Sequence, residues 1–204
     1  MKVTWCLMIW LACGMVAGAE GTSEPPVVVV SGAVMDLLSS GRECLMSGKM
    51  TEAQALFEKA CHLDPSNNEA AFGLSAALIE LKRYEEAQPL LEKLNKEVPD
   101  NPMVKNNLAW VLLKVKAASP ESAARAVKLA RSALLDVPSD FSIWNTLGEA
   151  YYATGQFEKG LSAAQSGWRL SQLAGITNSP CRELVARCRK AAGAASLDPD
   201  NAAP

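Results

Sequence analysis

The chain has 204 residues, of which 20 are Lys or Arg and 22 are Asp or Glu, so its formal net charge is −2. This balance excludes a strongly basic nucleic-acid-binding protein, because little positive charge is left over to neutralise phosphates. Hydrophobic residues make up 49% of the chain, which excludes a disordered polypeptide. We therefore expect one globular unit or one extended array of repeats, with no nucleic acid among its partners.

Residues 1–19 have the pattern of a secretory signal peptide. Lys2 precedes an apolar stretch from Val3 to Val16, and Ala17-Gly18-Ala19 supplies the small residues that signal peptidase requires. Cleavage there makes Glu20 the first mature residue. The sequence thus predicts an exported protein, periplasmic or secreted.

Two alternatives for this segment stay open. It could be an uncleaved anchor, or it could be lipidated at Cys13, because Leu11-Ala12-Cys13-Gly14 is similar to a bacterial lipobox. Only these alternatives would place the protein on a membrane. The following residues, 20–33, lack periodicity and contain Pro25-Pro26, so we expect an extended tether.

The remainder of the chain repeats itself. Pro65 recurs one repeat later as Pro99, and Pro99 recurs after a longer repeat as Pro138. The five extra residues of the longer repeat are 116–120. Within a repeat the apolar residues have helical spacing, as in Trp144, Leu147, Gly148 and Tyr151 at i, i+3, i+4 and i+7. The step from Pro65 to Pro99 has the length that predicts stacked pairs of helices.

Polar and proline residues mark where these helices begin and end. Thr51 with Gln54 has the form of a capping box, which predicts a helix start. Ser119 and Ser179 each precede a proline, as an N-cap precedes proline at the first helical position. The second helix of a repeat is expected to end just before its proline, at Pro65, Pro99 and Pro138.

These residues resemble the tetratricopeptide repeat family, whose pattern is Trp, Leu-Gly and Tyr on the first helix, and Ala, Phe, Ala and Pro on or after the second. Trp144, Leu147-Gly148 and Tyr151 carry the first half, and Ala53, Phe57, Ala60 and Pro65 the second. The resemblance implies an all-α, right-handed α-solenoid of four helix-turn-helix units with a C-terminal capping helix. The units are residues 34–67, 68–101, 102–140 and 141–174 within an array at 34–178, followed by a capping helix at 179–194 and a flexible tail at 195–204.

The expected capping helix is amphipathic. Its apolar stripe is Cys181, Leu184, Val185, Cys188 and Ala191, and we expect it to cover Trp168 and Leu161. Its basic residues are expected mainly on the solvent side: Arg182, Arg187, Arg189 and Lys190. Close contact between the helices of the fourth repeat is expected at Gly148, Gly160 and Gly167.

Nothing in the sequence predicts catalysis, a metal site or a cofactor. His62 is the only histidine, and no Cys-x-x-Cys spacing accompanies it. No nucleophile elbow, Walker loop or dinucleotide fingerprint occurs. We therefore expect a protein that is not an enzyme.

The cysteines left after export are expected to be free thiols buried in the core. Cys181 and Cys188 are seven residues apart on one helix, about 10 Å along its axis, which is beyond disulfide reach. Cys44 and Cys61 fall on antiparallel helices at axial positions about 12 Å apart. An unexpected pairing among the four stays open.

The resemblance implies that the first helix of each repeat lines a concave groove that holds a protein or peptide partner. The residues at the family's groove positions are Leu38, Arg42, Leu45, Phe72, Ile79, Asn106, Trp110, Leu113, Asn145, Glu149 and Tyr152. This groove would be apolar, and we expect it to bind an amphipathic helix or an extended segment. The alternative function is a membrane-tethered structural subunit of a cell-envelope assembly or secretion complex.

Overall fold

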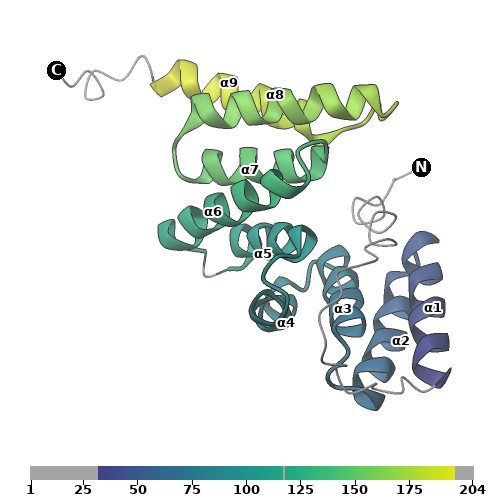
Figure 1. The fold of residues 1–204 in the computed structure, drawn as a ribbon. Coiled ribbons are helices and arrows are strands. Elements are labelled where there is room, and N and C mark those ends of the chain that lie inside the picture. The colour runs from purple at the N-terminus through teal and green to yellow at the C-terminus, as the bar shows by residue number, and fades with distance from the viewer. Residues whose placement is uncertain (1–31, 117, 196–204) are drawn as a thin grey trace, which may run out of the picture. The chain divides into compact units, whose positions relative to one another are not determined.

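The computed structural model describes residues 32–116 and 118–195, and these form nine α-helices and no strand (Figure 1). The expected signal peptide, most of the tether and all of the expected tail except residue 195, which ends α9, lie outside the described residues. The helices are α1 (Gly32–Met46), α2 (Met50–Leu63), α3 (Asn68–Glu80), α4 (Tyr84–Glu97), α5 (Pro102–Lys114), α6 (Pro120–Asp136), α7 (Phe141–Ala153), α8 (Phe157–Leu173) and α9 (Pro180–Ala195). The all-α fold class is confirmed.

The chain divides into two compact units, one ending at Leu94 and the other beginning at Asn95. In the first unit α2 packs against both α1 and α3, and α1 contacts α3. In the second, each helix from α5 to α9 packs against the next, α5 contacts α7, and α7 contacts α9. Within these two sets each helix thus meets the next along the chain, and the odd-numbered neighbours α1 and α3, α5 and α7, and α7 and α9 also touch, as in stacked helical hairpins. None of the described helices is long and apolar enough to cross a bilayer.

Prolines and short polar side chains set the helix ends. α2 ends at Leu63, α4 at Glu97 and α6 at Asp136, each two residues before a proline, as predicted. The predicted cap Ser119 accepts a hydrogen bond from the amide of Ser122 at 3.2 Å. Three further N-caps were not predicted from the sequence and stand at the starts of α3, α5 and α7: Asn67, Asn101 and Asp140.

One predicted helix start is wrong. α2 begins at Met50 after Lys49, which makes no side-chain cap, so Thr51 and Gln54 do not form a capping box. The reason is the preceding turn, which leads directly into the helix and places Thr51 inside its first turn. At the N-terminus the first described helix, α1, begins at Gly32.

Tight turns of one type join α1 to α2, α3 to α4 and α7 to α8, whereas α5 ends in an extended residue, Val115. After α3 the amide of Lys82 donates to Ile79 O at 2.9 Å and that of Arg83 to Leu78 O at 2.8 Å. This pair of bonds forms a Schellman cap, which needs a residue with positive φ. Lys82 has φ 61°, whereas the equivalent residues after α1 and α7 are glycines, Gly48 and Gly155, with φ 78° and 72°.

The core of the first unit is built around one aromatic ring. Phe57 of α2 has no exposed surface and lies between Gly41 of α1 and Gly73 of α3. A Cβ at Gly41 would lie 2.7 Å from the ring, and one at Gly73 would lie 2.4 Å from it. Two glycines on different helices therefore form the slot that the ring fills.

In the second unit α9 fills similar notches and caps the array. The apolar side chains of α9 pack against Leu161 and Trp168, as predicted. Cys181 Sγ lies 2.8 Å from where a Cβ at Gly167 would be, Cys188 Sγ 3.1 Å from that of Gly160, and Leu184 Cδ2 2.8 Å from that of Gly148. The three glycines bring α7 and α8 together and also admit the side chains of α9.

Candidate functional site

The eleven predicted groove residues fall on two faces, one in each unit. The α1/α3 face is formed by Leu38, Arg42, Leu45, Phe72 and Ile79, and the α5/α7 face by Asn106, Trp110, Leu113, Asn145, Glu149 and Tyr152. Five are buried and six are half-buried. Binding to either face stays a prediction.

The α1/α3 face is closed by apolar packing and an ion pair. Leu38, Leu45 and Ile79 are buried in the core of the first unit. The guanidinium of Arg42 donates a hydrogen bond to the carboxylate of Glu69, linking α1 to α3. Of the three aliphatic and one aromatic groove residues on this face, only Phe72 reaches the surface in part.

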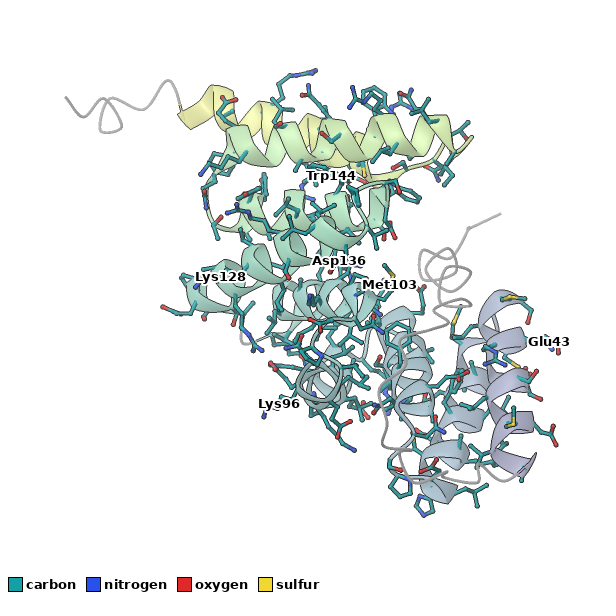
Figure 2. The ribbon with its side chains drawn as sticks, viewed as in Figure 1. Glu43, Lys96, Met103, Lys128, Asp136 and Trp144 are labelled. Carbon is teal, nitrogen blue, oxygen red and sulfur yellow. The ribbon has the colours of Figure 1, made fainter. Side chains whose placement is uncertain are left out.

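The α5/α7 face has large side chains at its surface. Trp110 of α5 is half-buried, and Lys114 Nζ, one turn further on, lies 4.2 Å from the centre of its ring. Leu113 and Met103 lie on the same stripe of α5 as Trp110, because residues three, four and seven apart share a helix face. Both are also half-buried. Figure 2 shows Met103 projecting from the start of α5.

An arginine from α9 borders this face. Arg187 donates to Glu149 through Nη1 at 2.8 Å and Nη2 at 3.2 Å, and its Cζ lies 4.5 Å from the centre of the Tyr152 ring. Burial is the largest single effect and disfavours its charge, but the hydrogen bonds and the negative charge of Glu149, together with Tyr152, outweigh it and raise the pKa of Arg187. The solvent-side prediction is therefore wrong for Arg187, which joins the capping helix to two predicted groove residues.

Two asparagines on the face have polar atoms without partners. Asn106 of α5 is 4% exposed and Asn145 of α7 is 1% exposed. Asn106 Oδ1 and Asn145 Oδ1 are the only buried side-chain nitrogen or oxygen atoms of the described residues that lack a hydrogen-bond partner. Such atoms are rare in folded proteins, because a buried acceptor without a donor destabilises the fold.

The other side chains that could carry chemistry are the cysteines and the possible metal ligands. Cys181 and Cys188 are buried as predicted, and burial raises the pKa of both thiols. Cys44 and Cys61 are only half-buried, which corrects their assignment to the core; each lies near a helix end, where fewer neighbours cover it. No described group of three or more His, Cys, Asp or Glu residues could hold a metal ion.

Comparisons with known proteins agree with this helical arrangement. Residues 45–111 and 108–171 each match a family model described as tetratricopeptide repeat. A comparison with curated proteins gives no match.

Among solved structures, the chain is similar to TTC0263, a thermophilic TPR protein of Thermus thermophilus. The TM-score is 0.64 with 17% identity over 80% of this chain and 84% of that one. MamA from Desulfovibrio magneticus RS-1 gives a TM-score of 0.58 with 20% identity over 83% of this chain and 99% of that one. At these identities the likeness concerns the fold.

Proposed function

Because the chain belongs to the tetratricopeptide repeat family, we propose that it is a non-catalytic interaction module whose α5/α7 face binds a segment of a partner protein. The observation that carries this proposal is Trp110. Its large ring lies half-buried on a helix surface, although the interior of the same unit has room for large side chains such as Ile143 and Leu184. Tryptophans in such positions are frequent hot spots of protein interfaces.

The same reasoning favours the α5/α7 face over the α1/α3 face. On α1 and α3 most predicted groove residues already bury their apolar surface within the unit, and Arg42 and Glu69 satisfy each other. On α5 and α7 three half-buried residues offer apolar or aromatic surface to a partner: Trp110, Leu113 and Tyr152. The part of the predicted groove in the second unit is therefore the better candidate.

The test compares two tryptophans of this unit. Peptides selected from a displayed random library on the full chain serve as the probe, and their affinity is measured for Trp110→Ala and Trp144→Ala. Trp144 donates from Nε1 to Pro138 O at 2.7 Å and lies against α8, so its replacement should lower stability (Figure 2). Trp110→Ala should instead weaken binding by about 2 kcal/mol or more with a smaller loss of stability. A selected peptide whose affinity is unaffected by Trp110→Ala would refute the proposed face.

We further propose that the module acts after export, supported by the signal pattern of residues 1–19. The tethered alternative predicts a lipidated Cys13 or a retained signal segment. The intact mass of the protein isolated from its host separates these forms, because each leaves a different N-terminus.

A further inference from the structure

The two partnerless oxygens occupy one repeated position. Asn145 follows Asn106 by the length of the longer repeat, which is also the step from Pro99 to Pro138, and α5 and α7 are in contact. One repeat before Asn106 the same position holds Phe72, and one repeat earlier still it holds Leu38. At this position the first unit carries apolar side chains, and the second unit carries amides.

The contrast shows that the fold does not require asparagine here. Leu38 is buried and Phe72 half-buried, and neither brings a polar atom into the helix packing. Asn106 and Asn145 each bring a carboxamide whose oxygen is left without a donor. They therefore destabilise the free protein, and a donor supplied from outside would remove that cost.

A donor from outside has a route to these residues. Asn106 lies on the stripe of α5 whose other members are half-buried, namely Met103, Trp110 and Leu113. Asn145 lies one turn from Glu149 and two turns from Tyr152, which also reach the surface in part. The terminal torsion of an asparagine is broad and roughly two-fold, so a carboxamide can turn toward an incoming group.

We propose that the partner binds the α5/α7 face as an extended segment, and that two of its main-chain N–H groups donate to Asn106 Oδ1 and Asn145 Oδ1. This inference rests on the proposed function and decides between the two partner forms that the sequence left open. An α-helix has its interior N–H groups bonded to its own carbonyls, whereas an extended chain has them free. Packed helices lie about 8–10 Å apart, roughly three residues of extended chain, so the two donors should be about three residues apart.

The first test needs no ligand. Asn106→Leu and Asn145→Leu each remove a partnerless buried atom and restore the side-chain type found at Leu38, so the urea midpoint of the full chain should rise for both. Asn107→Leu is the matched control, because Asn107 lies on the same helix as Asn106 with the same 4% exposure but has no partnerless buried atom. It should give no such rise. Lower midpoints for both Asn106→Leu and Asn145→Leu would overturn the inference.

The second test uses backbone chemistry. A peptide selected from a displayed library on the full chain is resynthesised with one N-methyl group at each amide in turn, which removes that N–H donor. Two positions about three residues apart should each lose about tenfold in affinity for the wild type. In Asn106→Leu the loss at one of these two positions should disappear, and in Asn145→Leu the loss at the other.

The outcomes separate this inference from the proposed function. Binding that depends on Trp110 but tolerates every N-methyl group overturns the extended-chain inference and leaves the module intact. Binding that ignores Trp110, or a library that yields no binder, overturns both.

Discussion

Replacement of Gly73 by alanine tests how tightly the first unit is packed. Alanine alone would favour the helix by about 1 kcal/mol over glycine. Its Cβ, however, would lie 2.4, 2.5 and 2.7 Å from three ring atoms of Phe57, where carbon atoms prefer about 3.5–4.0 Å. The ring would have to move by about 1 Å. It cannot do so freely, because the backbone of Gly41 on α1 also packs against it, so closely that a Cβ there would lie 2.7 Å from the ring.

Overpacking of this kind costs about 1–3 kcal/mol. With no room to relax we take the upper value, so after the gain in helix propensity Gly73→Ala should lower the unfolding free energy by about 2 kcal/mol. Urea unfolding followed by far-ultraviolet circular dichroism measures the change. Gly193→Ala is the control, because a Cβ there meets nothing within 4 Å, and it should not destabilise. A Gly73→Ala protein as stable as the wild type would show that the ring can shift and that the slot is not close-packed.

Four further predictions follow from individual contacts. Lys82→Gly should raise stability by up to about 1 kcal/mol in urea unfolding, because glycine adopts the positive φ of this turn without strain; a loss would contradict the turn geometry. Arg187→Leu should cost about 1–2 kcal/mol by the same assay, since it leaves Glu149, whose side chain is only 15% exposed, without its partner; an unchanged midpoint would mean that the pair contributes nothing. Intact mass should place the mature N-terminus at Glu20, and a lipidated Cys13 would refute this. Alkylation of the denatured, unreduced protein should label four thiols. In the native state the half-buried Cys44 and Cys61 should react before the buried Cys181 and Cys188, and the reverse order would contradict this.

The sequence predicted the helix ends better than the helix starts. Proline removes an amide donor and disfavours the helical region for the residue before it, and together with the repeat step this located three ends at Pro65, Pro99 and Pro138. Proline alone would not have sufficed, because Pro89 lies inside α4. Whether a residue can cap a helix depends on where the preceding turn ends and the helix begins. Thr51 has the right residue type for a cap, yet the turn at Gly48 starts α2 two residues too early for it.

The sequence predicted which helices carry the candidate site residues, but not which groups their side chains contact. Family positions placed Trp110 and Glu149 on first helices of their repeats, and both are there. That Arg187 reaches Glu149 depends on how α9 docks, which no residue spacing specifies. That Asn106 and Asn145 hold partnerless oxygens depends on the packed neighbours, because the sequence pattern alone shows only a change from apolar to amide side chains.

Photo-crosslinking tests the central claim most directly, namely that the α5/α7 face binds a partner segment. A selected peptide carrying a benzophenone side chain is irradiated with the full chain, and the crosslinked residues are identified by mass spectrometry. We expect crosslinks to the half-buried residues of this face, with Met103 and Trp110 foremost, and competition by the unlabelled peptide. Saturable crosslinks confined to α6 and α8, with none on α5 or α7, would contradict it.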